Sequence, residues 1–442
     1  MGSLGEEIID LFRGHPNPGV LPMAALTEAS AAVMASPDIQ AKSLMYGPDE
    51  GYMPLRQHIA QWLSDFYQPI APISADRICI TGGASQNLAC ILQVYSDPIY
   101  TRNVWMVAPT YFLACRMMDD AGFTGRMRGI PEDEKSGVDL AYLRRGLIAA
   151  EEKANEEGNL KPIHKPSRPW GKVYKHLIYA VPTFSNPATL TMSRSDREQL
   201  VRLAREFDAL IITDDVYDFL QWSPDPKKTL SEPSRSQYPR LVDVDRYLDD
   251  GPHDEWGNTV SNGSFSKLIG PGTRTGWAEG TEKMAFGISQ AGSTRSGGAP
   301  SHLAAAIIDQ LFPTAFPQYL ETSLQPMYAG RYHRLMGAIR EYLLPLGVTL
   351  PSSAPDVAGG YFIWAQLPAP LSASALAPVA LREQKVKVAT GNLFEVQGDP
   401  SGCAGELDRC IRLCFAWEEE DKLAEGVRRL ACAVQRALGK GI

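Results

Sequence analysis

The chain has 442 residues, of which 44% are hydrophobic and 21% are charged, and its formal net charge is −8. This length exceeds one ordinary hydrophobic core and predicts about two domains. The negative charge argues against a nucleic-acid-binding protein, and no apolar run is long enough to span a bilayer. The start, MGSLGEEIIDLF, lacks the basic and apolar regions of a secretory signal, and the seven cysteines show neither paired nor metal-ligand spacing. We therefore expect a cytoplasmic protein with reduced thiols, no metal site, and no membrane or nucleic-acid partner.

The N-terminal region combines a Pro/Gly-rich stretch, RGHPNPGVLP, with a helical pattern of small residues, AALTEASAAVMAS. Beyond it, short apolar runs alternate with amphipathic helical patterns such as SQNLACILQVY and SRSDREQLVRLAREF. Several of these runs are almost continuously apolar, which is typical of strands buried on both faces, and the alternation predicts an α/β sheet domain. The predicted strands are 77–81, 104–108, 176–181, 209–213, 259–265 and 273–280.

Two regions interrupt the alternation. Residues 150–175 are polar and are predicted to form a surface excursion, and residues 221–258, rich in Pro, Asp and Ser, are predicted to form a long loop region. A long helical pattern over 316–345 follows. The strand candidates GGYFIWAQL and RCIRLCFAW and a final amphipathic helix then predict a smaller α+β domain.

Polar and aromatic residues follow five of the predicted strands, at the sheet edge where open α/β sheets bind their ligands. The segment GGASQNL, after the first strand, places two glycines and a serine at a helix start, which suits an anion. The later strand ends carry Tyr111, then Asn186, then Asp214 with Tyr217, and finally Lys267 with Arg274.

A phosphorylated aromatic carbonyl compound would use all of these groups, and pyridoxal phosphate is such a compound. Its aldehyde reacts with a lysine and its ring nitrogen needs a carboxylate, which Lys267 and Asp214 would provide. Its phosphate suits Ser85, Ser264, Ser266, Arg274 and the helix start at 83–85.

The segment GSFSKLIGPGTRTGW (263–277) is similar to the cofactor-lysine signature of fold-type I pyridoxal-phosphate enzymes of the class I/II aminotransferase family. It resembles the aminoadipate/aromatic branch most, and the fungal-type tryptophan aminotransferases within it. The resemblance runs from LFRGHP to CIRLCFAW, nearly the whole chain. It implies a large pyridoxal-phosphate-binding domain over 45–315 with a mainly parallel seven-stranded sheet, and a small α+β domain over 316–442. The N-terminal segment, 1–44, would join the small domain and cover the substrate.

The resemblance also implies cofactor-binding roles. Lys267 would form the Schiff base and shuttle the proton, and Asp214 would pair with the pyridinium nitrogen. Tyr217 and Asn186 would bond the phenolic oxygen, and Tyr111 would stack on the ring. The phosphate would be bound by Gly83, Ala84, Ser85, Ser264, Ser266 and Arg274, with Tyr46 reaching it from the neighbouring subunit of a homodimer.

For the substrate, the resemblance implies that Arg412 clamps the α-carboxylate, beside Asn186 and Gly14. In the strand pattern, Arg412 shares a face with two cysteines; these small thiols suggest a buried face, where a guanidinium requires an anion. The His15 and His302 side chains are expected to be structural or pocket-lining, and Asp215 to be a turn former.

The implied function is transfer of an amino group from an L-amino acid to a 2-oxo acid by ping-pong chemistry. The same residues also suit a lyase, replacement or condensation enzyme on this fold, as in fungal secondary metabolism. A non-catalytic cofactor-binding module is disfavoured because Lys267, Asp214 and Arg412 are all present. The donor is expected to be aromatic or large and apolar, on the strength of Tyr46, Tyr111, Phe112, Phe184 and Trp417, with Arg13 and Arg295 as candidates for binding a second carboxylate.

Two departures from the family pattern stand out. Relatives usually read Asn-Pro-Thr-Gly where this chain has NPAT (186–189), so the turn after Asn186 is altered. The 221–258 insertion lengthens the interval between Asp214 and Lys267, and it could cap the entrance of the site.

Overall fold

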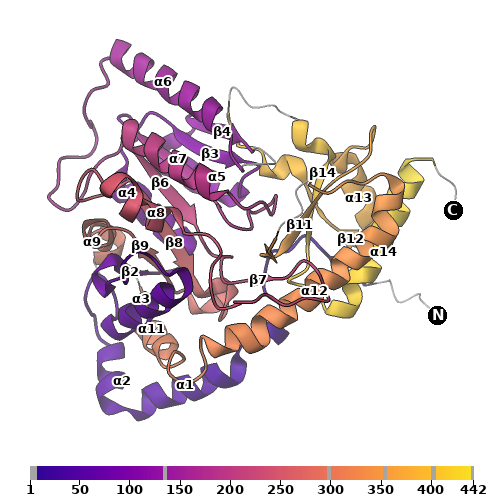
Figure 1. Ribbon diagram of the computed structural model, residues 1–442, viewed down its shortest axis with the longest axis horizontal. Helices are drawn as coiled ribbons and strands as arrows, with labels where there is room; N and C mark the ends of the chain where they lie inside the picture. The colour runs from indigo at the N-terminus through magenta and orange to yellow at the C-terminus, as the bar shows by residue number, and fades with distance from the viewer. Residues whose placement is uncertain (1–6, 133–136, 296–299, 352–355, 400–404, 440–442) are drawn as a thin grey trace.

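The computed structural model describes residues 7–132, 137–295, 300–351, 356–399 and 405–439 (Figure 1). Residues 1–6 of the predicted N-terminal segment lie outside the described residues. None of the helices in these ranges is long and apolar enough to cross a membrane, and the six cysteines within them are free thiols.

A seven-stranded sheet forms the centre of the larger part of the molecule (Figure 1). The strand order is β2-β9-β8-β6-β5-β3-β4, and within this sheet β9 alone runs antiparallel to its neighbours. The fold class predicted from the sequence is therefore confirmed. The strands are β2 (Ile78–Thr81), β3 (Val104–Ala108), β4 (Met127–Pro131), β5 (His176–Ala180), β6 (Ala209–Asp214), β8 (Thr259–Ser264) and β9 (Gly276–Glu279).

The strand prediction missed β4 and misplaced one strand end. In β4 only Met127 and Ile130 are buried, so its sequence lacks the apolar run that revealed the other strands. Strand β9 begins at Gly276 and not at residue 273, because a 3-10 turn, Pro271–Thr273, precedes it and Arg274 has a left-handed backbone (φ 46°). Arg274 therefore lies in the turn before the strand.

Helices cover both faces of the sheet, and strand alternation sends successive side chains to opposite faces. On β6, Leu210 and Ile212 pack with helices α4, α5 and α9, whereas Ile211 packs with α6, α7 and α8. The helices of this part are α3 (Met53–Tyr67), α4 (Ala84–Tyr95), α5 (Phe112–Met118), α6 (Leu140–Glu156), α7 (Arg194–Glu206), α8 (Leu241–Tyr247), α9 (Glu282–Ser289), α10 (Gly292–Arg295) and α11 (His302–Asp309).

Two expectations for the connecting regions were wrong in part, and a third was confirmed. Helix α6 continues to Glu156, into the polar stretch expected to be a surface excursion. The 221–258 region contains α8, whose Leu241 and Val244 pack against the sheet, and β7 (Gln221–Trp222), which pairs with β10 (Ala358–Gly359). The long helical pattern predicted over 316–345 is confirmed: α12 (Gln325–Ala338) is continuous with π-helical turns over 320–324 and 339–343.

The C-terminal part is built on an antiparallel sheet of order β11-β14-β13. Helix α14 packs against α12 and α13. On its predicted apolar face Leu423, Val427, Leu430 and Val434 are buried, whereas Leu438 follows the helix and is half-buried. The elements of this part are β11 (Phe362–Gln366), α13 (Ala373–Gln384), β12 (Val386–Lys387), β13 (Ala389–Thr390), β14 (Cys410–Cys414) and α14 (Glu420–Ala437).

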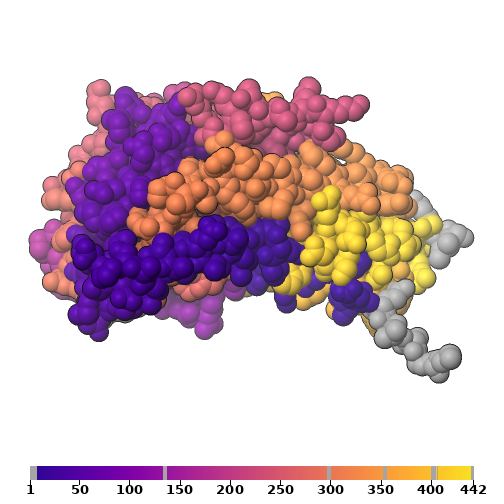
Figure 2. Space-filling view, turned by 90° about the horizontal axis from the view of Figure 1, so that it is seen from below, coloured from indigo at the N-terminus to yellow at the C-terminus, as the bar shows by residue number. Residues whose placement is uncertain are grey.

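The N-terminal segment connects the two parts. Strand β1 (Ile9–Asp10) pairs in parallel with β12, while α1 (Met23–Ala35) and α2 (Pro37–Ser43) pack against α11. Figure 2 shows this indigo segment lying along one face and reaching the yellow C-terminal part. The segment thus contacts both the larger part and the C-terminal part of the molecule. The domain boundaries predicted after residues 44 and 315 remain a prediction.

Candidate active site

A cavity of about 420 Å³ lies at the carboxyl ends of the parallel strands, where the sequence predicted a ligand site. Segments that follow β2, β3, β5, β6 and β8 form its sheet side, and the N-terminal segment and C-terminal part form the remainder. The predicted site residues that line it are Gly14, Ala84, Ser85, Tyr111, Asn186, Asp214, Tyr217, Ser264, Ser266, Lys267, Arg274 and Arg412.

Two predicted site residues do not line this cavity. Gly83 precedes α4 with φ of 94°, and a Cβ placed there would lie 2.6 Å from Nη2 of Arg274. A glycine is thus required for Arg274 to approach the helix start. Tyr46 is 86% exposed and lies away from the cavity of its own chain.

The carboxylate of Asp214 lies inside the cavity at the end of β6. One oxygen accepts a hydrogen bond from the Tyr179 hydroxyl at 3.1 Å, and among the described residues nothing bonds Oδ1. Burial raises the pKa of Asp214 to about 7, and the charge of Lys267 opposes that shift. A buried carboxylate oxygen without a donor fits a cationic ring N–H of a ligand.

The adjacent Asp215 points away from the cavity. It accepts a hydrogen bond from the Thr213 hydroxyl at 2.8 Å and another from Ser261, and it belongs to a buried charge network behind the sheet. The sequence-based interpretation of Asp215 as a turn former was therefore incomplete: it is a core residue with partners.

Lys267 follows β8 and its ammonium donates to the backbone oxygen of Gly14 at 2.9 Å. Burial lowers the pKa of Lys267 to about 8, although Cys414 and Asp214 act in the opposite direction. Within the described residues, no carboxylate lies within salt-bridge distance of its Nζ, so its amine is available in the uncharged form close to neutral pH.

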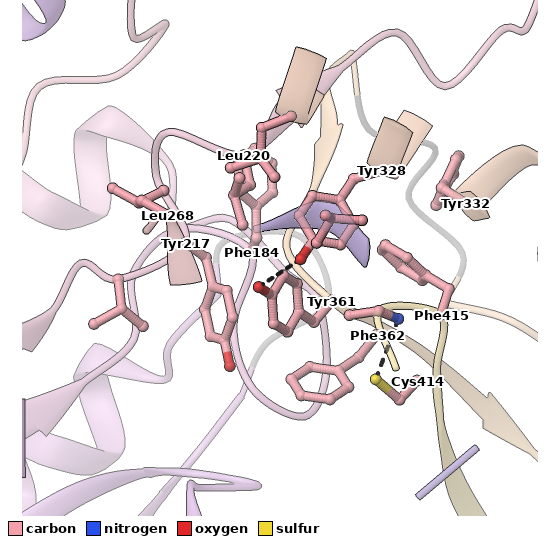
Figure 3. Close-up of a cluster of buried hydrophobic side chains, with 14 of the residues drawn as sticks. Phe184, Tyr217, Leu220, Leu268, Tyr328, Tyr332, Tyr361, Phe362, Cys414 and Phe415 are labelled. Carbon is pink, nitrogen blue, oxygen red and sulfur yellow. Dashed lines mark hydrogen bonds between the residues drawn. The ribbon is translucent and has the colours of Figure 1, made fainter. Parts of the chain in front are cut away.

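A tyrosine that the sequence did not reveal holds the Lys267 backbone. The Tyr361 hydroxyl donates to the main-chain oxygen of Lys267 at 3.2 Å. It is also bonded to the Tyr328 hydroxyl at 2.8 Å, as Figure 3 shows. Its ring centroid lies 5.2 Å from Nζ of Lys267. Tyr217 packs beside these rings, 5.5 Å from Tyr361 and 6.0 Å from Phe362.

Hydroxyl groups, a helix start and a cation meet at one end of the cavity. Ser264 donates to the Ser266 hydroxyl at 2.9 Å and accepts from the Ser266 backbone, and Arg274 reaches Ser266 at 3.4 Å and the Gly82 carbonyl at 2.9 Å. Helix α4 begins there without a side-chain cap. In the described part of the chain Arg274 has no acidic partner, so this corner suits a phosphate.

Arg412 lies at the other end, on the central strand of the C-terminal sheet. It is 3% exposed and donates to Oδ1 of Asn186 at 2.8 Å and to the carbonyl of Phe12 at 2.7 Å. The ring of Phe362 stacks on its guanidinium, with the centroid 3.9 Å from Cζ. None of the described acidic residues pairs with it, and burial lowers its pKa, so the site provides an unneutralised cation for an anionic ligand.

Gly14 allows this close packing. A Cβ at this position would lie 2.8 Å from the Phe362 ring and 4.0 Å from Arg412. The carbonyl of Gly14 accepts a hydrogen bond from the Lys267 ammonium, so this residue lies beside both Lys267 and Arg412.

Several lining residues escaped the sequence analysis: Tyr179, Asn262, Phe362 and Lys387. Tyr179 is the fourth residue of a wholly buried strand and resembles core. Phe362 lies in an apolar run, and Lys387 comes from a two-residue strand, so neither carried a local signal. Asn262 bonds Asn87 at 2.8 Å and the Ala84 carbonyl at 3.0 Å, which positions the start of α4.

Other residues considered from the sequence fall into two groups. Arg13, His15 and Phe112 line the cavity, with Arg13 stacked on Trp417 at 4.5 Å. Phe184, Trp417, Arg295 and His302 are not among its lining residues, and neither is any residue of 221–258, which was expected to cap the entrance.

Comparison with known proteins places this geometry in a family. A family model described as aminotransferase class I and II matches residues 18–430. The chain belongs to this family. It is 33% identical over 434 residues to the uncharacterized protein YER152C of Saccharomyces cerevisiae, with 95% of each chain covered. It is 28% identical to aromatic-amino-acid aminotransferase 1 of Thermococcus litoralis, covering 98% of this chain and 89% of that one.

Solved structures agree with this assignment. The crystal structure of Pyrococcus horikoshii kynurenine aminotransferase in complex with PMP (pyridoxamine phosphate) matches with a TM-score of 0.77 at 26% identity, covering 98% of this chain and 92% of that chain. The protein is thus a pyridoxal-phosphate-dependent aminotransferase of fold type I.

The residues of this aminotransferase fit the cofactor on independent grounds. The unbonded oxygen of Asp214 matches a ring N–H, and the serine and arginine corner at α4 matches a phosphate. Lys267 provides a buried amine of lowered pKa between them. Within the described residues there is no group of three or more His, Cys, Asp or Glu side chains that could hold a metal ion.

Proposed function

We propose that this aminotransferase moves the amino group of an aromatic or large apolar L-amino acid to a 2-oxo acid. The observation that carries the proposal is the buried Arg412 without an acidic partner, set beside aromatic and aliphatic walls. The guanidinium would hold the donor carboxylate by two parallel hydrogen bonds, while the apolar walls receive its side chain. The apolar lining comprises Phe12, Leu88, Phe112, Leu113, Met117, Val181 and Phe362.

In the proposed reaction, Asp214 holds the cofactor ring and Arg274, Ser264 and Ser266 hold its phosphate. Bound pyridoxal phosphate supplies an electron sink for the pair of electrons left on the donor α-carbon. Lys267 takes the α-proton onto Nζ, which requires the uncharged amine; its pKa of about 8 provides a useful fraction of that form near neutral pH.

The remaining residues position the reactants. The Tyr361 hydroxyl fixes the backbone of Lys267, and Asn186 holds Arg412 in the orientation that faces the cavity. Tyr111, whose pKa burial raises to about 12, stays a neutral phenol and would provide a flat surface for the cofactor ring. Tyr217 would donate to the ring oxygen of the cofactor.

We also propose a homodimer in which Tyr46 completes the phosphate site of the partner chain. Leu44, Met45 and Tyr46 form an exposed apolar run, with 58%, 67% and 86% of each residue exposed. Monomers rarely expose such a run, which favours an interface. Analytical ultracentrifugation with Tyr46→Phe as a probe tests this: we expect a dimer with weakened cofactor binding, and a monomer with full activity would contradict it.

Two cations at the cavity mouth support a second candidate donor. Arg13 and Lys387 line the cavity; Lys387 lies 4.0 Å from Asp10, and Arg13 stacks on Trp417. Either could bind the side-chain carboxylate of a dicarboxylic amino acid. We favour the aromatic donor because Arg13 already covers an indole ring and Lys387 already has an acidic partner.

A comparison of donors tests the proposed specificity. With a common oxo-acid acceptor, we expect kcat/KM for phenylalanine or tryptophan to exceed that for glutamate by about tenfold or more. Lys387→Met should leave the aromatic value within about twofold. A strict preference for glutamate that Lys387→Met abolishes would establish the dicarboxylate donor instead.

A further inference from the structure

A second cavity of about 440 Å³ shares the lining residue Phe362 with the candidate active site. Its lining comes mainly from three segments: the 183–191 loop, residues 218–238, and the C-terminal part from Tyr332 to Trp364. The insertion that was expected to cap the active site therefore contributes to this cavity.

Two features connect the cavities. Phe362 lines both of them, and its ring stacks on the Arg412 guanidinium. The 183–191 loop separates them: Asn186 faces the active site and bonds Arg412, whereas Thr189 and Leu190 line the second cavity. An occupant of the second cavity would thus contact the immediate neighbours of the proposed carboxylate-binding arginine.

The backbone of the separating loop is strained at two residues. Phe184 has φ of 50° and Thr189 has φ of 62°, a region that β-branched and bulky side chains rarely adopt. Both residues line the second cavity. Such conformations persist mainly where surrounding structure or function requires them.

Two acidic residues, Asp218 and Asp356, and one cation, Arg340, line the cavity, and this excess of acid favours a cationic ligand. Asp218 is 3% exposed; one of its carboxylate oxygens accepts from the Tyr67 hydroxyl at 2.9 Å, and among the described residues nothing bonds Oδ1. The aromatic rings that line the cavity are Phe184, Tyr238, Tyr332, Phe362 and Trp364. Burial and the charge of Asp215 raise the pKa of Asp218 well above its usual range, so its carboxyl group ionises fully only beside a further cation. Its free oxygen, surrounded by rings, therefore suits a protonated amine attached to an aromatic group.

We propose that this second cavity is an effector site for small aromatic amines, and that its occupant changes the affinity of the active site for the donor carboxylate. The coupling acts through Phe362 and the 183–191 loop, which together set the position of Arg412. Phe362 and Asn186 are positioning residues in this account.

Binding to the holoenzyme tests the proposal directly. The probe is N,N-dimethylphenethylamine, a tertiary amine that is protonated at neutral pH and cannot condense with the cofactor aldehyde. Isothermal titration should show one site per chain. Met336→Trp, which fills the cavity from α12, should weaken binding about tenfold or more, whereas Met336→Leu keeps the volume and should bind within about twofold of wild type.

Asp218→Asn removes the carboxyl group that can ionise beside a bound amine and keeps the shape, so it carries the test if the tryptophan variant does not fold. It should weaken binding about fivefold or more. Saturating probe should change the KM of the amino-acid donor by about fivefold in wild type, in a mixed rather than a competitive pattern, and by less than twofold in Met336→Trp. The binding readout does not depend on the substrate proposed above.

Three results would overturn the proposal. One is the absence of saturable heat up to the solubility limit of the probe. Another is binding that the donor displaces competitively and that Met336→Trp leaves unchanged, because the probe then occupies the active site. The third is binding at the second cavity with no change in donor KM, which would leave a cavity without coupling.

Discussion

Asp214 and Asp215 are adjacent in the chain and belong to two different kinds of buried charge. Asp214 faces the candidate active site, where Lys267, Arg412 and Arg274 have no acidic partner among the described residues. Asp215 faces a network behind the sheet, where it accepts from two hydroxyls. Unpartnered buried charges require a ligand, and partnered ones hold the fold.

The partnered network is centred on Arg240. It bonds Asp243 at 2.9 Å and Glu279 at 2.7 Å, and its guanidinium lies 4.0 Å from the Tyr67 ring centroid. All three charged groups are at most 2% exposed. Substitutions of the unpartnered charges in the active site should therefore impair catalysis, whereas substitutions in the partnered network should impair folding.

The largest effect is expected for Lys267→Ala. Removing the amine that accepts the α-proton should lower kcat by about 10³–10⁴-fold, while the melting temperature stays close to that of wild type. The cofactor should still bind through Asp214 and the phosphate corner, without the absorbance of the lysine-bound form. Steady-state kinetics and the absorbance spectrum measure both outcomes, and turnover near the wild-type value would refute the assignment of Lys267.

Arg240→Ala should produce the opposite pattern. It leaves Asp243 and Glu279 as buried charges without their cation, so the free energy of unfolding should fall by about 3–5 kcal/mol. Urea unfolding measures this, with Arg202→Ala as control because that arginine forms an exposed pair with Asp249. The control should lose less than about 1 kcal/mol. Equal losses in both variants would mean that the network does not hold the fold.

Arg412→Lys tests the proposed carboxylate site. A lysine keeps the charge but cannot form two parallel bonds, so the KM of the donor should rise by about 10–100-fold with a smaller change in kcat. Arg409→Lys is the matched control on the approach to the same strand, because Arg409 bonds the Leu367 carbonyl outside the cavity. If both variants keep the wild-type KM, Arg412 does not bind the donor.

Asp214→Asn has a pH-dependent effect on the cofactor-free protein. The pKa of Asp214 is raised to about 7, so the folded chain binds more protons than the unfolded chain between about pH 4 and 7. The stability of wild type should therefore fall as pH rises through this window, and the variant should lack that fall. At pH 8 the variant should be more stable by about 1–3 kcal/mol, with little difference at pH 4. Parallel pH curves for the two proteins, measured by urea unfolding, would contradict the raised pKa.

Thr189→Gly should have the smallest effect. Relief of the left-handed backbone and the greater freedom of the unfolded chain act in opposite directions, which leaves a gain of about 1 kcal/mol or less. Lys385→Gly, at φ 54° after α13, is the matched control remote from both cavities. Thermal unfolding should show similar small gains; a clear loss at Thr189 alone would show that its conformation is not strained.

The sequence predicted the active-site half of this comparison well. Lys267, Asp214, Asn186 and Tyr111 were recognisable because each follows a buried strand, and the edge of a parallel sheet brings such positions together. Arg412 was recognisable from its place between two cysteines in an apolar run.

The other features depend on contacts that no local pattern records. Tyr361 and Phe362 look like core residues in GGYFIW, and their roles arise only where the C-terminal sheet meets Lys267 and Arg412. Helix α8 was hidden by its Pro- and Asp-rich surroundings, because its acidic residues pair with buried arginines such as Arg205. The second cavity joins the 183–191 loop to the C-terminal part more than a hundred residues later, which periodicity cannot bring together.

The most direct test of the central account is a single half-reaction. The cofactor-loaded protein is mixed with one aromatic L-amino acid in the absence of any oxo acid, and both the cofactor spectrum and the released oxo acid are measured. The account predicts conversion to the pyridoxamine form with one equivalent of oxo acid per chain, and no conversion in Lys267→Ala. An unchanged cofactor spectrum, with ammonia or another leaving group accumulating over many turnovers, would contradict it and indicate an elimination or replacement enzyme.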